Sequence, residues 1–139
     1  MTSAFYRHPN WDTALRRLQA IVPTAEGFLP DQIEVAERVQ RHRIDLDDRT
    51  DAAIAHDLWA VVPKPSSGEL IVVTEASWGP DFNGPFFIDA ELLDGFINEH
   101  PERAGRVFFE GDVIILEPDS RRLIVVHHEG VAWLFALDD

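Results

Sequence analysis

The residues with the clearest chemical potential lie near the C-terminus, at His127, His128 and Glu129. Neighbouring side chains of an extended strand point to opposite faces, so His127 and Glu129 can share a face while His128 points away. With Asp112 or Glu110 from an adjacent strand, that pair could bind a divalent cation or carry out acid–base chemistry. Neither His-x-x-x-His nor Glu-x-x-His spacing supplies a third ligand nearby. We therefore favour the alternative, a histidine pair beside a turn with one ring packed and one solvated.

Other catalytic and ligand-binding signatures are absent from the sequence. The chain has no cysteine, which excludes disulfides and cysteine-ligated metal sites. It also lacks a Gly-x-Ser-x-Gly nucleophile turn and the glycine patterns that bind phosphate. The carboxylates of Asp45–Asp51 do not follow the order of an EF-hand, so we assign Asp48 and Asp51 to capping a short helix, Asp51–Asp57. We expect no cofactor, no bound metal and no enzymatic activity.

A loop rich in aromatic residues offers a different kind of site. Residues Ala76–Phe87 contain two Gly-Pro dipeptides, which exclude a regular helix. We expect Phe86 and Phe87 to pack in the core, because they lead into the next element. Aromatic side chains in loops often carry binding energy, so Trp78 and Phe82 are candidates for contact with a partner. The alternative is that these two rings also close the edge of the core.

The charge is strongly acidic and unevenly distributed. The net charge is −13; residues 1–44 carry six arginines against five acids (+1), and residues 45–139 carry six basic residues against 20 acids (−14). Such a chain repels nucleic acid and anionic membranes but attracts a basic protein. We expect Asp81, Glu110, Asp112 and Glu129 to form pairs with that partner. The alternative is an acidic surface that only maintains solubility.

The C-terminal third, Val107–Leu137, is predicted to position these carboxylates. It contains runs of β-branched and aromatic residues separated by turns at Pro118-Asp119 and Glu129-Gly130. This pattern predicts a three-stranded antiparallel meander. Its apolar runs are continuous, which favours central strands covered by helices on one face.

Helical spacing of apolar residues predicts the remaining elements. A first helix spans Trp11–Ile21 after a cap at Asn10, and a second spans Asp31–Gln40. For the second, Ile33, Val35 and Val39 also allow an extended conformation. A central helix begins at Asp89, where Ile88 and Leu93 can form a hydrophobic staple, and His100-Pro101 closes it. A hairpin is predicted from Leu58–Val62 and Glu69–Glu75.

Together these elements predict an α+β fold. N-terminal helices and one central helix would pack on a mostly antiparallel sheet that ends in the meander. The length suits a single domain over residues 1–139. No apolar run reaches the roughly 20 residues of a membrane span, so we expect a soluble cytoplasmic protein. The oligomeric state stays open.

The whole chain, with its C-terminal residues Gly111-Asp112-Val113-Ile114-Ile115 and Val125-Val126-His127-His128-Glu129-Gly130, resembles the immunity proteins of bacterial polymorphic toxin systems. The resemblance implies a small cytoplasmic domain without enzymatic activity that binds and occludes a cognate toxin, often a basic nuclease. It carries over no individual binding residue. Two alternatives remain: an enzyme that acts on a small ligand or uses a metal, centred on His127, Glu129 and Asp112, and a structural subunit of an assembly.

Overall fold

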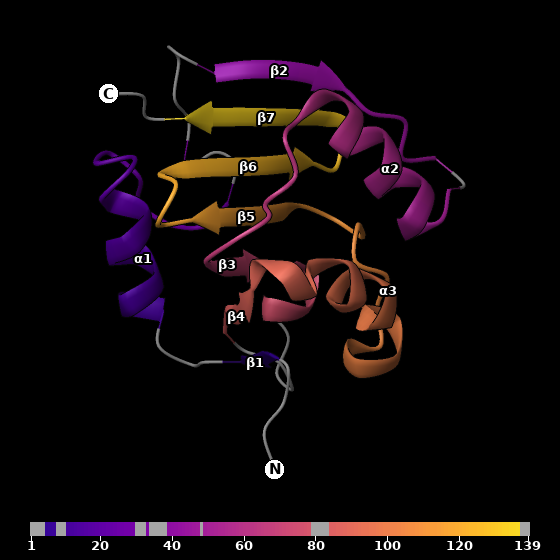
Figure 1. Cartoon of the computed structure of the whole chain (residues 1–139), viewed down its shortest axis with the longest axis horizontal. Helices are drawn as coiled ribbons and strands as arrows, with labels where there is room; N and C mark the ends of the chain where they lie inside the picture. The colour runs from indigo at the N-terminus through magenta and orange to yellow at the C-terminus, as the bar shows by residue number, and fades with distance from the viewer. Residues whose placement is uncertain are drawn as a thin grey trace.

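The fold consists of one antiparallel sheet with helices packed against it (Figure 1). The computed structural model describes residues 5–7, 11–29, 33, 39–47, 49–78 and 84–136. Within them, seven strands lie in the order β1-β4-β3-β5-β6-β7-β2, and every neighbouring pair is antiparallel. The strands are β1 (Phe5–Arg7), β2 (Val39–Arg43), β3 (Glu69–Val73), β4 (Phe86–Asp89), β5 (Val113–Glu117), β6 (Arg122–His127) and β7 (Val131–Ala136). The α+β prediction is confirmed.

The predicted C-terminal meander is present as β5, β6 and β7. In its register Val113 pairs with Val126, and Val126 pairs with Ala132. The two connections fall at the predicted turns, where Arg121 and Gly130 adopt φ values of 55° and 88°. The turn chemistry of the sequence therefore determined both reversals of the chain.

Helices cover both faces of the sheet, whereas we expected them on one. Alternate strand residues contribute to two separate hydrophobic clusters. One cluster contains Leu70, Val72 and Ile115 with helices α2 (Asp51–Val61) and α3 (Leu93–Ala104). The other contains Ile71, Val73 and Ile114 with helix α1 (Trp11–Gln19). The strands read as continuous apolar runs because both of their faces are buried.

Helix α1 (Trp11–Gln19) confirms the first predicted helix, two residues shorter than expected. Its apolar stripe buries Ala14 and Leu18 against the sheet. Ile21 and Val22 follow the helix and are also buried, so they continue the same apolar surface without helical geometry. The predicted cap at Asn10 lies outside the described residues.

The second predicted helix, Asp31–Gln40, is wrong at its C-terminal end. Val39 and Gln40 begin strand β2, which pairs with β7 from Val39↔Phe135 to Arg43↔Val131. Most of the preceding residues lie outside those described. The sheet edge offered by β7 supplied backbone partners that local helical spacing could not predict.

The predicted strand Leu58–Val62 is also wrong, because these residues end helix α2 (Asp51–Val61). Ile54, Ala55 and Leu58 form its buried face, so the apolar run continues the helical period of the residues before it. Thr50 caps the helix, its hydroxyl accepting a bond from Ala53 N at 3.1 Å. Asp48 is outside the described residues. Strand β3 instead pairs with β4 and β5, so the predicted hairpin does not form.

The central helix is longer than predicted. Asp89 precedes a 3-10 turn, η3 (Ala90–Leu92), and makes no side-chain capping bond, and helix α3 then spans Leu93–Ala104. Pro101 lies inside α3, and the helix ends at Gly105 with φ of 74°. A second 3-10 turn, η2 (Glu75–Trp78), follows β3. In the described part of the chain, no helix has the length and apolarity that crossing a bilayer requires.

Candidate functional site

One end of the sheet collects acidic residues from four segments. Because the strands are antiparallel, the C-terminal ends of β2, β3 and β6 lie beside the N-terminal ends of β5 and β7, at the right in Figure 1. We call this region the acidic end. It carries exposed or half-buried carboxylates from the segments that meet there: Asp45, Asp47, Glu75, Glu110, Asp112 and Glu129. Three of the predicted partner-binding carboxylates, Glu110, Asp112 and Glu129, are therefore brought to one region.

An open pocket of about 690 Å³ lies at this end, between the end of β2 and the turn from β6 to β7. Its charged lining consists of three carboxylates and one arginine, with His128 at the side, and the full lining is Arg43, Ile44, Asp45, Leu46, Asp47, His128, Glu129 and Gly130. Ile44 N donates to Gly130 O at 2.8 Å and closes the floor between the two segments. The pocket therefore presents an excess of negative charge.

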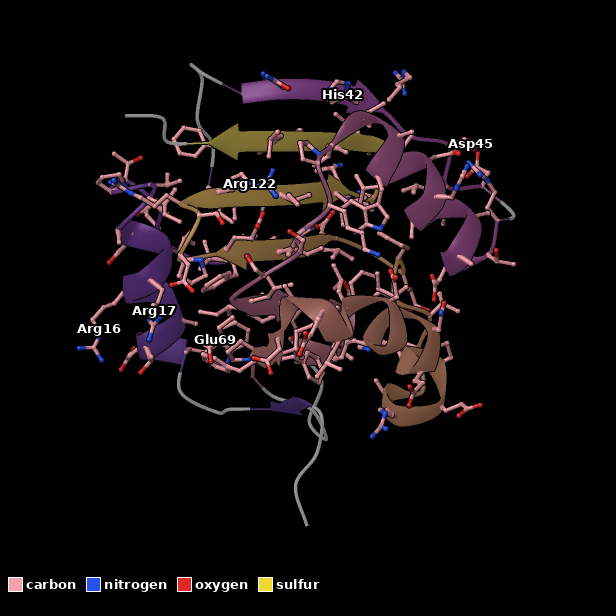
Figure 2. The ribbon with its side chains drawn as sticks, in the orientation of Figure 1. Arg16, Arg17, His42, Asp45, Glu69 and Arg122 are labelled. Carbon is pink, nitrogen blue, oxygen red and sulfur yellow. The ribbon has the colours of Figure 1, made fainter. Side chains whose placement is uncertain are left out.

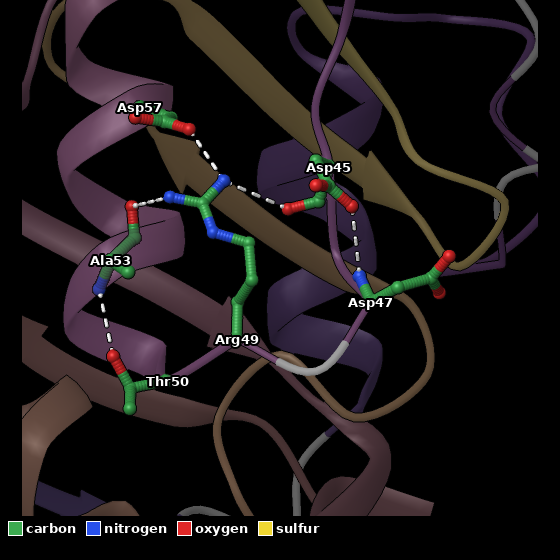
Figure 3. A network of polar contacts seen from close by, with 6 residues as sticks. All are labelled: Asp45, Asp47, Arg49, Thr50, Ala53 and Asp57. Atoms are coloured by element: carbon green, nitrogen blue, oxygen red, sulfur yellow. Dashed lines mark hydrogen bonds and ion pairs between the residues drawn. The ribbon is translucent and has the colours of Figure 1, made fainter.

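Arg49 holds the acidic loop of this pocket against helix α2 (Figure 3). Its Nη1 donates to the carbonyl of Asp45 at 3.1 Å and to Oδ2 of Asp57 at 2.5 Å. Its Nη2 donates to the carbonyl of Ala53 at 3.1 Å. The hydrogen bond from Arg49 lowers the pKa of Asp57. Asp45 in turn accepts from the backbone of Asp47 at 3.1 Å, so one guanidinium orders the pocket loop.

Asp112, His127 and His128 form a compact cluster beside the pocket. Each offers a ligand atom within 4.8 Å of the others. The two imidazoles stack with centroids 4.3 Å apart and an interplanar angle of 26°. We expected His128 to point away from His127, but β6 ends at His127 and His128 lies in the turn, where strand alternation no longer applies.

Asp112 determines the orientation of His128. Its Oδ1 accepts from the backbone N–H of His128 at 2.8 Å and lies 2.8 Å from the ring Nδ1. A carboxylate only accepts, so Nδ1 of His128 carries a hydrogen. The hydrogen bond to Asp112 raises the pKa of His128, and the charges of Asp112, Glu129 and Glu75 act in the same direction.

Glu129 has a different place from the one predicted. Its side chain is 75% exposed, with Oε1 3.6 Å from His127 Nδ1. Its backbone N–H donates to the same nitrogen at 3.1 Å. The cluster that the fold gathers therefore contains His128 where the sequence suggested Glu129.

Trp78 occupies an intermediate position between core and surface. Its side chain is 44% exposed, while its indole stacks on that of Trp11 at 4.6 Å between centroids. Phe86 and Phe87 are buried, at 4% and 6% exposed, in agreement with the prediction. Asp81 and Phe82 lie outside the described residues. Trp78 thus keeps an accessible part, but its stacking partner belongs to helix α1, which Figure 1 draws on the opposite side from the acidic end.

Glu110 and Glu75 have local partners. Glu110 forms an ion pair with Arg106, four residues earlier. The Glu75 carboxylate lies against Gly111, where a Cβ atom would be 2.2 Å from its Oε2. Sequence reasoning missed Asp45, Asp47 and Arg49 as site residues. The run of carboxylates after β2 was a visible signal, but only the approach of the β6–β7 turn made it the wall of a pocket.

Comparisons with known proteins do not assign the chain to a group. No protein-family model matches it, and the searches of curated proteins and of solved structures also found no match.

Proposed function

We propose that this chain is a protein-binding module without enzymatic activity, and that its acidic end docks on a basic surface of another protein. The observation that carries this proposal is the pocket lined by Asp45, Asp47 and Glu129. An arginine or lysine side chain of the partner fits such a pocket, because carboxylates are the acceptors that these cations prefer. The positive charge of Arg43, which also lines the pocket, would repel the partner's cation and so restrict the direction from which it enters.

The arrangement of charge over the molecule supports this orientation. In Figure 2 Asp45 lies at the acidic end, while Arg16 and Arg17 of α1 lie on the other side of the molecule. Opposite charges separated in this way align an approaching basic protein before contact. Exposed carboxylates contribute more to the association rate and to specificity than to affinity.

Trp78 supplies the apolar part of the proposed interface. Trp78 lies in η2, which follows strand β3, and β3 is separated from β7 by β5 and β6 in the sheet. An interface of standard size buries roughly 800 Å² per partner. A partner that contacts both Trp78 and the pocket would have to extend across these strands.

The function that fits this surface is inhibition by steric occlusion. A basic enzyme whose active site received the acidic end would be closed to its substrate. Together with the resemblance to immunity proteins of polymorphic toxin systems, this supports a bacterial cytoplasmic inhibitor of a basic toxin as the specific form of the proposal.

A capture experiment with matched charge variants tests the proposal. The purified chain would be used to capture proteins from its own cell extract at low and high salt. The triple variant Asp45→Asn, Asp47→Asn, Glu129→Gln removes the pocket charges, and Glu26→Gln, Glu91→Gln, Glu102→Gln removes as many exposed charges elsewhere. We expect a basic partner that binds the native chain and the second variant, is lost with the first, and is released by salt. Equal capture by both variants would contradict the assignment of the pocket.

The alternative function, an enzyme centred on His127, Glu129 and Asp112, is favoured by one observation: the pocket adjoins His128 and leaves room for a small ligand. A turnover that His127→Ala abolishes, in a variant whose folding is unchanged, would establish it. Metal binding without turnover would not.

A further inference from the structure

We propose that Asp112, His127 and His128 form a binding site for a divalent transition-metal ion of the zinc class, at the edge of the acidic pocket. This inference does not depend on the proposed protein partner. It rests on the position of the three side chains, on the hydrogen bonds that Asp112 and His127 accept, and on the surrounding charge.

The sheet register places the ligands. Val113 of β5 pairs with Val126 of β6, so Asp112 and His127 come next to each other one residue beyond that pair. His128 is added because the chain turns after His127. The candidate ligand atoms lie within 4.8 Å of one another. Ligands around a tetrahedral zinc ion are about 3.4 Å apart, given bonds of roughly 2.0–2.2 Å, so modest side-chain rotations close the site.

Hydrogen atoms now occupy the positions that a cation would take. Asp112 Oδ1 accepts from the His128 backbone and from the His128 ring. His127 Nδ1 accepts from the backbone N–H of Glu129. A divalent cation can displace these hydrogen bonds, because its full charge attracts the lone pairs more strongly than the partial charge of an N–H group does. The Glu129 carboxylate, 3.6 Å from His127 Nδ1, adds negative charge beside the position of the ion.

The ligand types determine which metals fit. Two imidazoles favour zinc, cobalt, nickel or copper(II), whereas calcium and magnesium prefer sites made of oxygen ligands. The carboxylates of Glu75 and Glu129 make the potential around His128 more negative, which attracts a cation. Three protein ligands leave at least one coordination position open. His128 is also part of the pocket lining, so the proposed ion would lie beside the pocket.

Calorimetric titration of untagged protein tests the site directly. The chain carries six histidines, so a polyhistidine tag would hide the result. At pH 8, where protons compete less for the imidazoles, we expect zinc to bind one site per chain and calcium and magnesium not to bind. Cobalt should give a visible absorption spectrum, and zinc should raise the thermal midpoint because it binds only the folded chain.

Three variants and one control assign the site to its residues. His128→Gln and Asp112→Asn should each weaken zinc binding by more than about tenfold, and Glu129→Gln by less. His56→Gln removes an exposed histidine on α2 and should leave binding unchanged. His128 is 58% exposed at its side chain, so its substitution should not unfold the chain, and circular dichroism would check this.

Two results would overturn the inference. One is zinc binding that His128→Gln and Asp112→Asn leave as strong as in the native chain. The other is the absence of zinc binding to the folded native chain at millimolar metal. Neither result would bear on capture of a basic protein by Asp45 and Asp47.

Discussion

Gly130 lies directly against the backbone of Ile44. A Cβ atom built on Gly130 would be 2.8 Å from the carbonyl oxygen of Ile44, and the glycine adopts φ of 88°. Its own carbonyl accepts the Ile44 N–H at 2.8 Å. This contact joins the turn between β6 and β7 to the end of β2, and so forms the pocket.

Gly130→Ala should therefore destabilise the fold and distort the pocket. Left-handed backbone costs a non-glycine residue about 1–2 kcal/mol, and the close contact with a backbone atom adds to that cost. Urea unfolding should show a loss of roughly 2–4 kcal/mol. Gly105→Ala is the matched control, because Gly105 has φ of 74° with nothing within 4 Å of its Cβ position. An equal loss in both variants would mean that the contact with Ile44 contributes nothing.

Trp78→Ala should weaken partner binding and lower stability by a small amount. The stack on Trp11 contributes about 0.5–1.5 kcal/mol beyond the area that it buries. The stack therefore predicts a slight decrease in the thermal midpoint. A double-mutant cycle with Trp11→Ala measures the coupling. A loss above about 4 kcal/mol would place Trp78 in the core and remove it as an anchor.

His100 should make the fold less stable in mild acid. It is 2% exposed, surrounded by Phe86, Phe96 and Phe108, and its Nε2 lies 3.1 Å from Thr74 Oγ1. Burial lowers the pKa of His100 to about 4, against a weaker opposing effect of Asp51.

The unfolded chain therefore takes up a proton at His100 at a higher pH than the folded chain. The contribution of neutral His100 to the free energy of unfolding is fully present above about pH 6.5. It decreases by about 3 kcal/mol as the pH falls towards 4. Urea titrations at pH 7 and pH 4.5 measure the difference. Protonation of carboxylates also destabilises the folded chain in acid. The diagnostic result is therefore a smaller decrease in the free energy of unfolding for His100→Gln than for the native chain.

Arg122→Met should be strongly destabilising, because it leaves Glu117 buried without its cation. Arg122 Nη2 lies 2.6 Å from Glu117 Oε2 in a cross-strand pair, and Glu117 is 3% exposed. Burial raises the pKa of Glu117, partly offset by Arg122. We expect a loss of about 3–5 kcal/mol at pH 7 in thermal or urea unfolding.

The pH dependence of that variant follows from the raised pKa of Glu117. The folded chain holds the proton of this carboxyl more tightly than the unfolded chain, so the loss is smallest in acid and grows as the pH rises through the folded pKa. The double variant Glu117→Leu, Arg122→Met removes both charges and should recover most of the stability. If the double variant is as unstable as the single one, the isolated charge is not the cause.

The sequence alone determined the local features of this protein. The turns at Pro118-Asp119 and Glu129-Gly130 and the apolar stripe of α1 depend on neighbouring residues, and the burial of Phe86 and Phe87 was indicated by their place at the start of the next element. Side-chain period and turn chemistry act over a few residues, so they can be read from the chain. The acidic character of residues 45–139 was equally visible.

The tertiary structure decided which segments meet. Val39–Arg43 became a strand because β7 offered it an edge, and Leu58–Val61 became helical as the end of α2. The site depends on contacts across the chain in the same way. His128 joins His127 because the strand ends between them, and Asp45 lines a pocket because Gly130 lies against Ile44. Pairing between distant segments depends on the free energy of the whole packed sheet, which local patterns do not contain.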